Sequence, residues 1–159
     1  MRDPFIQAVL DNDLEAVHTV LATGRDPNIP DQYGWIALHL AATNQSSEVA
    51  RLLVQAGSSL TARGTDGWTP LHLAAVSGSS AMVEFLISVG AEVNSQSSRG
   101  DTPLHLCVTS CNRESAEALL SAGADPTIRN RAGLTPLSKA QDQKCISVAE
   151  LISSWTKPA

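Results

Sequence analysis

A period of 33 residues runs through this chain and constrains its fold more than any other feature. Three series of residues share that spacing without an insertion. They are the glycines Gly34, Gly67, Gly100 and Gly133, the glycines Gly24, Gly57, Gly90 and Gly123, and the histidines His39, His72 and His105. Self-similarity at a fixed interval of about 20 to 50 residues is typical of chains that stack one supersecondary unit many times. The sequence therefore predicts a repeat architecture.

Each unit reads as two helices joined by a short break. Thr69-Pro70 opens the first helix of one unit, because a threonine hydroxyl caps unpaired N–H groups and proline suits the first helical turn. Ala74 and Ala75 follow, and their small side chains allow helices to pack closely. The second helix carries larger apolar residues at helical spacing and ends at a glycine. In the third unit this glycine is Gly90.

The break between the two helices favours glycine or asparagine, because the backbone there often needs a positive φ. The residues at this position are Asn12, Gln45, Gly78, Cys111 and Lys144. Three of them depart from the preference, so we expect weaker or differently shaped turns at Gln45, Cys111 and Lys144.

The start of the first helix carries a recognisable motif. Thr69-Pro70-Leu71-His72 recurs as Thr102-Pro103-Leu104-His105, with degraded copies at residues 36–42 and 135–140. On these residues and the 33-residue period, the chain resembles the ankyrin-repeat family. The resemblance implies an all-α repeat solenoid of helix-turn-helix units with β-hairpin loops. It further implies that the repeated histidine forms hydrogen bonds between neighbouring turns, and that loop tips and first-helix surfaces contact protein partners.

The repeat predicts that residues 1–159 form one domain of about five units. We expect an N-terminal capping repeat at 1–29, internal repeats at 30–62, 63–95 and 96–128, and a C-terminal capping repeat at 129–159. The caps are indicated by polar residues such as Asp11 and Asp13 at one end and Lys139 and Gln141 at the other. Trp155 is expected to cover the end of the last helix pair.

Charge and cysteine content narrow the range of partners. The chain has a formal net charge of −5 and only 11 Lys and Arg, which disfavours direct binding to nucleic acid or to an anionic membrane surface. No apolar stretch approaches the roughly 18 residues of a membrane helix. Cys107, Cys111 and Cys145 are few and odd in number, as expected for reduced thiols in a cytoplasmic or nuclear protein. We also expect the isolated chain to be a monomer.

The sequence predicts neither catalysis nor a cofactor. The three histidines occupy one role in successive units, whereas a catalytic triad needs different residue types at one point. A zinc site built from His105, Cys107 and Cys111 is disfavoured, because His105 lies about 160° from Cys107 around a helix. Cys107 stands where Ala74 stands in the preceding unit, which indicates a small core residue.

Positions that contact partners in the family give a candidate interaction surface. The loop tips contribute Tyr33, Trp35, Arg63, Asp66, Trp68, Arg99, Asp101, Arg129 and Arg131, and the first helices contribute Asn44, Val76, Ser77, Thr109 and Ser110. Trp35 and Trp68 follow turn glycines in adjacent units, so we expect a neighbouring pair of indoles that anchors a partner. The alternative is that each indole folds onto its own loop.

The basic tips lie toward the C-terminal end, at Arg99, Arg129 and Arg131, and the aromatic tips toward the N-terminal end. This gradient fits a partner with one apolar and one acidic segment, or else ordinary solvated charge. Asn94 follows Leu86 at a spacing that resembles hydroxylated asparagines of the family, although asparagine is also usual there for structural reasons.

The function predicted from the sequence is a non-catalytic protein–protein interaction module, such as an adaptor, an inhibitor or a recognition domain. The alternatives are a structural or engineered scaffold without a single native partner, and the targeting domain of a larger enzyme.

Overall fold

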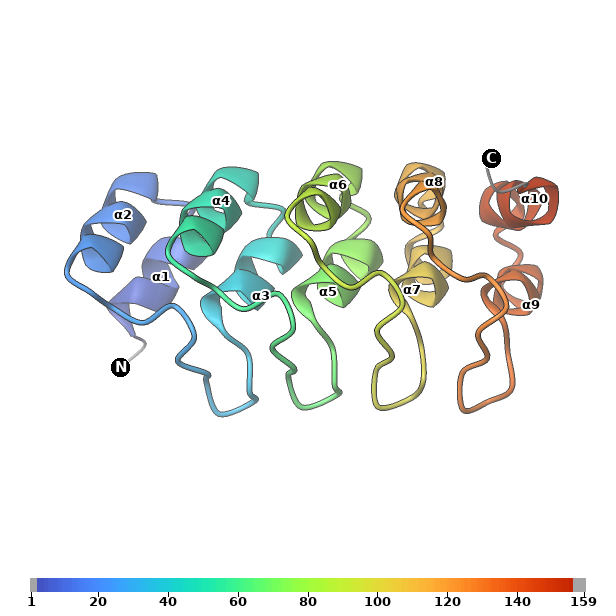
Figure 1. Ribbon diagram of the computed structural model, residues 1–159, viewed down its shortest axis with the longest axis horizontal. Helices are drawn as coiled ribbons and strands as arrows, with labels where there is room; N and C mark the ends of the chain where they lie inside the picture. Colours follow the sequence, from blue (N-terminus) through green and yellow to red (C-terminus); the bar gives the residue numbers. More distant parts are fainter. Residues whose placement is uncertain (1–2, 156–159) are drawn as a thin grey trace.

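The computed structural model describes residues 3–155, which form five helix pairs stacked side by side into an elongated solenoid (Figure 1). The pairs are α1 (Pro4–Leu10) with α2 (Leu14–Ala22), α3 (Ala37–Thr43) with α4 (Ser47–Gln55), α5 (Pro70–Ser77) with α6 (Ser80–Ser88), α7 (Pro103–Ser110) with α8 (Arg113–Ser121), and α9 (Pro136–Asp142) with α10 (Ile146–Ser154). The all-α repeat solenoid expected from the period is confirmed.

The helices form two layers (Figure 1). The odd-numbered helices make an inner row and the even-numbered helices an outer row, and each helix contacts its neighbours along its own row. The loops between units project from the inner row as a row of fingers, drawn at the lower edge of Figure 1. None of the helices within residues 3–155 has the length and apolar character needed to cross a membrane.

Histidines join each repeat to the next. The Nδ1 atom of His72 accepts a hydrogen bond from the backbone N–H of Thr69 at 3.1 Å, which closes the start of α5. Its Nε2 lies 3.0 Å from the carbonyl oxygen of Asp101 in the next finger. Because a carbonyl only accepts, Nε2 carries the ring hydrogen and His72 is neutral. His39 and His105 make the equivalent bonds to Trp68 and Leu134, as the resemblance implied.

The turns between paired helices share one backbone conformation. Asn12, Gln45, Cys111 and Lys144 all have φ between 49° and 60°, in the left-handed region that Gly78 adopts with φ of 73°. Of the two alternatives expected at Gln45, Cys111 and Lys144, a differently shaped turn is wrong, and a weaker turn stays a prediction. These three residues do not prefer the left-handed conformation, which costs about 1 to 3 kcal/mol at each of them.

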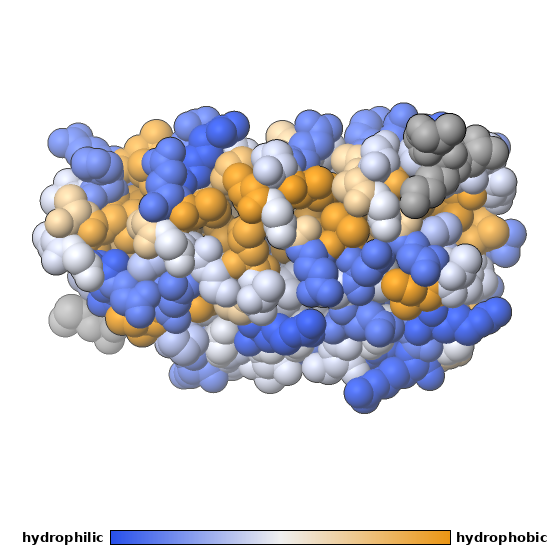
Figure 2. Space-filling model, in the orientation of Figure 1, coloured by the Kyte–Doolittle hydropathy of each residue, from blue (hydrophilic) through white to orange (hydrophobic). Residues whose placement is uncertain are grey.

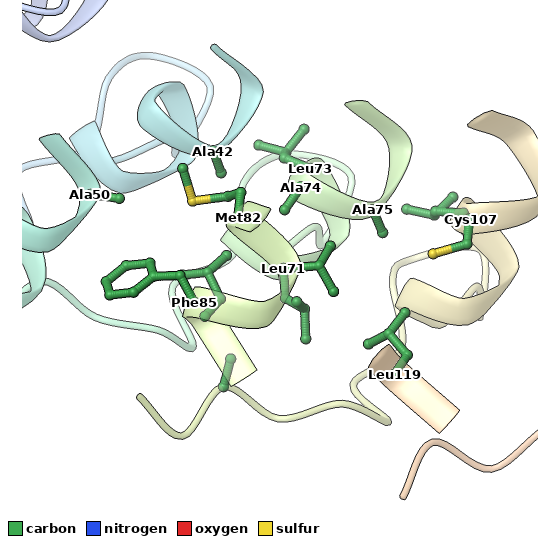
Figure 3. Close-up of a cluster of buried hydrophobic side chains, with 14 of the residues drawn as sticks. Ala42, Ala50, Leu71, Leu73, Ala74, Ala75, Met82, Phe85, Cys107 and Leu119 are labelled. Atoms are coloured by element: carbon green, nitrogen blue, oxygen red, sulfur yellow. The ribbon is translucent and has the colours of Figure 1, made fainter. Parts of the chain in front are cut away.

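Leucines and small residues from the inner helices pack against apolar residues from the outer helices to fill the core (Figure 3). Ala74 and Ala75 of α5 are fully buried, and so is Met82 of α6. Cys107 occupies the equivalent of Ala74 in α7 and is also fully buried, which raises the pKa of its thiol to about 12. It is a core residue, as the sequence indicated.

The fingers are tight turns, and none of the residues from 3 to 155 forms a β-strand. Within a finger, the N–H of Ser97 donates to the carbonyl of Asp101 at 2.9 Å. Between fingers, the N–H of Arg131 donates to the carbonyl of Arg99 at 2.9 Å. The β-hairpin detail of the prediction is thus not confirmed, although backbone hydrogen bonds link the fingers into a row.

The expectation that all three cysteines are reduced thiols is wrong for two of them. Cys111 and Cys145 form a disulfide whose Cα atoms lie 5.6 Å apart, and Cys107 is the free cysteine within the described part of the chain. The two paired residues are 34 positions apart. Since one period is 33 residues, Cys145 follows the turn that stacks directly on the turn of Cys111.

Candidate functional site

An open groove of about 740 Å³ lies between the fingers and the inner helices at the C-terminal half of the solenoid. Six residues of the predicted interaction surface line it, namely Trp68, Val76, Arg99, Asp101, Thr109 and Arg131. The other lining residues are Ser98, Leu106, Asn130, Ala132, Lys139 and Gln143, which were not predicted as contacts. We refer to the space enclosed by these twelve residues as the finger groove.

One part of the finger groove is apolar. Trp68 from a finger and Val76 from α5 are half-buried, and Leu106 of α7 also lines the groove, with 4% of its surface exposed. All three pack within or against the hydrophobic core, so their positions are held firmly. This part offers a preformed apolar seat for a side chain from another molecule.

The adjoining part carries an ion pair. Lys139 Nζ lies 3.6 Å from Asp101 Oδ1, and the two side chains are only 12% and 13% exposed. The Nδ2 atom of Asn130 also donates to Asp101 Oδ1, at 2.8 Å. The carboxylate of Asp101 is therefore already paired inside the protein.

The sequence period explains where this ion pair comes from. One repeat earlier, Trp68 occupies the position of Asp101 and Leu106 occupies the position of Lys139. The same two positions thus carry apolar side chains in one repeat and a charged pair in the next. The finger groove spans this change of character along its length.

Two arginines at the finger tips complete the charged part. Arg99 and Arg131 are exposed, and neither guanidinium group forms an ion pair or hydrogen bond within the described residues. Their fingers are adjacent, because the N–H of Arg131 donates to the carbonyl of Arg99. With Lys139 and Asp101 included, the finger groove holds three cationic groups and one carboxylate, in a chain whose net charge is −5.

Trp35 has a different environment from Trp68. Its indole stacks on the imidazole of His39, with ring centroids 6.3 Å apart and planes inclined by 18°. It also fills the space beside Gly64 in the next finger. No aromatic contact joins Trp35 to Trp68 within residues 3–155. The two indoles are therefore not in ring contact, and Trp35 packs onto the neighbouring finger rather than onto its own.

Two of the predicted arginines brace the fingers. Nη1 of Arg63 donates to the carbonyls of Gly67 and Gln96, at 3.2 Å and 2.6 Å, and Nη1 of Arg129 donates to the carbonyl of Gly133 at 2.7 Å. Gln96, at the equivalent position of the repeat between them, makes the same bond to Gly100. This position closes the finger in three successive units.

The remaining predicted contacts lie outside the finger groove. Tyr33 is 57% exposed at its finger tip, and Asp66 is exposed at the next tip. Asn44 lies at the turn after α3, where its Nδ2 donates to the carbonyl of Leu10. Two serines close α5 and α7, with Ser110 Oγ donating to the carbonyl of Ala75 and the carbonyl of Ser77 accepting from Gln45. Tips on the face drawn in Figure 2 are mostly hydrophilic, below an apolar band.

Asn94 holds two repeats together. Its Nδ2 donates to the carbonyl of Gly123 at 3.2 Å, and its Oδ1 accepts from the N–H of Asp125 at 2.8 Å. Asn28 makes the corresponding bonds to Gly57 and Ser59. The amide is thus used in stacking, so an enzyme that modifies it would have to displace both bonds.

The histidines show the features of structural residues. All three are fully buried, and desolvation lowers the pKa of each below the ordinary value of 6.5, to about 4 for His72. Each is therefore uncharged near neutral pH, with both ring nitrogens already bonded. Across residues 3–155 no group of three or more His, Cys, Asp or Glu side chains is arranged to hold a metal ion.

Comparison with known proteins agrees with this architecture. Among curated proteins, protein phosphatase 1 regulatory subunit 27 of Homo sapiens is 34% identical over 60 residues, which is 38% of this chain and 39% of that protein. Its counterpart of the same name from Mus musculus is 33% identical over 60 residues, with the same coverage. The matched segment is thus well under half of these relatives. A family model described as ankyrin repeats, in three copies, matches residues 5–97 and 66–130. Because those matches span most of the described residues, the chain belongs to the ankyrin-repeat family.

Proposed function

We propose that this chain is a non-catalytic interaction module that holds a protein partner in the finger groove. The observation that carries the proposal is the combination of a half-buried Trp68 with two unpaired arginines, Arg99 and Arg131, around one groove. Tryptophan and arginine are enriched among residues that dominate binding energy at protein interfaces. Ankyrin repeats as a class stack into extended surfaces that serve protein–protein contact.

The relatives suggest one partner to include in a test. The curated relatives are named as regulatory subunits of protein phosphatase 1. A regulatory subunit acts by binding another protein, which fits an adaptor role for this chain. We therefore propose the catalytic subunit of that phosphatase as one candidate partner, beside partners of other kinds.

The test is affinity capture with a matched pair of variants. The immobilised chain is compared with Trp68→Ala/Arg99→Ala/Arg131→Ala and with Arg51→Ala, which removes an exposed cation on α4 outside the finger groove. Captured proteins from lysate, and purified phosphatase 1 catalytic subunit in parallel, are quantified by mass spectrometry. The proposal expects a protein bound by the parent and by Arg51→Ala but lost by the triple variant. Equal capture by all three would exclude the finger groove as the binding site.

Other expectations stay predictions. They are a cytoplasmic or nuclear location, a monomeric state, an absence of direct nucleic-acid or membrane binding, and hydroxylation of Asn94. A scaffold without a single native partner would show no groove-dependent capture. A targeting domain of a larger enzyme would show it, with the catalytic unit elsewhere.

A further inference from the structure

We infer that the finger groove takes an extended peptide segment in which a large apolar side chain is separated by a few residues from acidic side chains. The inference rests on the proposed function and specifies the chemistry of the partner. In this arrangement the apolar side chain contacts Trp68, Val76 and Leu106, and the carboxylates meet Arg99 and Arg131.

Three side chains form the apolar part of the finger groove. Trp68 and Val76 keep part of their surface exposed to the groove although they pack against the core. Leu106 also lines the groove and is 4% exposed. A partner side chain placed there removes its own apolar surface and that of Trp68 from water, at about 25 cal/mol per Å². The seat needs no rearrangement of the fold.

Two unpaired arginines at the groove favour acidic side chains in the peptide. The only carboxylate among the residues that line the groove, Asp101, is already paired with Lys139 and hydrogen-bonded to Asn130. It is therefore not available to neutralise Arg99 or Arg131. Both guanidinium groups remain exposed and unpaired within the described residues, and a guanidinium binds a carboxylate through two parallel hydrogen bonds.

Geometry sets the spacing within the peptide. Trp68, Arg99 and Arg131 belong to three successive fingers. Stacked helices lie about 8 to 10 Å apart, and an extended chain advances about 3.3 Å per residue. The first carboxylate should therefore follow or precede the apolar residue by about three positions, and the second by about six.

An oligonucleotide is the other ligand that a pair of arginines could attract. The charge of the whole chain disfavours this ligand, because a net charge of −5 repels a phosphate backbone. Single-stranded oligonucleotide binding is therefore a contrary outcome in the experiment below.

The experiment selects random 12-residue peptides displayed on phage against the folded full chain, in parallel with Arg99→Glu/Arg131→Glu and the control Arg51→Glu. Thermal unfolding of each variant establishes that it is folded. Peptides enriched on the parent are synthesised, and their affinity is measured by fluorescence anisotropy at low and high salt. A labelled single-stranded oligonucleotide is measured beside them.

The expected result is a set of peptides with one large apolar residue and with Asp or Glu about three and six positions away. These should lose at least about tenfold in affinity on Arg99→Glu/Arg131→Glu, keep it on Arg51→Glu, and weaken at high salt. The charge-reversed variant should select Lys and Arg instead. Enrichment without acidic residues, no enrichment at all, or preference for the oligonucleotide would each overturn the inference. The proposed function would survive these results if groove-dependent capture of a folded protein persisted.

Discussion

The indole of Trp35 occupies the space that a side chain on Gly64 would need. An ideal Cβ at Gly64 would lie 2.1 Å from Cδ1 and 2.2 Å from Nε1 of Trp35. At the same position of the other fingers, Asp31, Ser97 and Asn130 bond backbone N–H groups within their own turns. In the finger that contains Gly64, the indole of Trp35 from the preceding repeat fills the space that those side chains would occupy.

This contact predicts a coupled pair of mutations. Gly64→Ala should lower the free energy of unfolding by about 1 to 3 kcal/mol, because the new methyl group collides with the indole. In a Trp35→Ala background the same change should cost less than about 0.5 kcal/mol, since the ring is gone. Urea unfolding of the four proteins gives the coupling. An equal cost in both backgrounds would show that the indole is not the obstacle.

Features with a local and repeated signal could be predicted from the sequence. Thr69, Pro70 and His72 act within a few residues of one another, so each copy of the motif carries the information for its own helix start. The positive φ of Gly90 likewise belongs to a helix end that the chain marks locally. The helix pairs and the structural role of the histidines could therefore be predicted.

Features that depend on the next repeat could not be predicted from the sequence. The seat of Trp35 is set by the absence of a side chain at Gly64, which is 29 residues away. The role of Lys139 in the finger groove depends on its pairing with Asp101. In the sequence alone, Lys139 looks like an ordinary polar residue of a cap. The disulfide has a signal that could have found it, because its separation of 34 residues is close to the repeat period.

His72 makes the stability of the solenoid depend on pH. Burial lowers the pKa of His72 to about 4 in the folded chain, while in the unfolded chain it returns to about 6.5. Between these two pH values the unfolded chain binds more protons than the folded chain. The contribution of His72 to the free energy of unfolding is therefore complete above pH 6.5 and is lost as the pH drops toward 4. The expected loss from His72 is about 3 kcal/mol, and the lowered pKa values of His39 and His105 add to it.

Urea unfolding between pH 7.5 and 5 measures this dependence in a range where most carboxylates stay ionised. His72→Gln is the control, since glutamine offers an N–H toward the Asp101 carbonyl but does not titrate. The slope of stability against pH should be shallower in the variant. An unchanged slope would mean that His72 is not the group that takes up the proton.

The disulfide predicts a difference between oxidised and reduced protein. Cys111 and Cys145 close a loop of about one repeat, so reduction should lower the free energy of unfolding by about 2 to 4 kcal/mol. Alkylation under denaturing conditions should label one thiol, Cys107, before reduction and three afterwards. Three labelled thiols without reductant would contradict the pairing of Cys111 with Cys145.

Replacing the ion pair of Asp101 and Lys139 tests whether the last two repeats need it in order to fold. Lys139→Leu alone should lower the free energy of unfolding by about 2 kcal/mol, because the largely buried carboxylate of Asp101 loses its cation. The double variant Asp101→Trp/Lys139→Leu recreates the Trp68 and Leu106 combination of the preceding repeat. Since well-packed apolar residues often replace a buried ion pair without loss, its stability should equal or exceed that of the parent.

Calorimetry and peptide binding on the same two variants measure separately what the ion pair contributes to folding and to binding. The double variant should unfold at or above the parent temperature and still bind peptides that carry an apolar residue. Its preference for acidic peptides over neutral ones should persist, because Asp101 and Lys139 are removed together and Arg99 and Arg131 keep the net positive charge of the groove unchanged. If the double variant is instead as unstable as Lys139→Leu, the charged pair belongs to the folding requirements of the last two repeats, because rebuilding the apolar contact did not replace it.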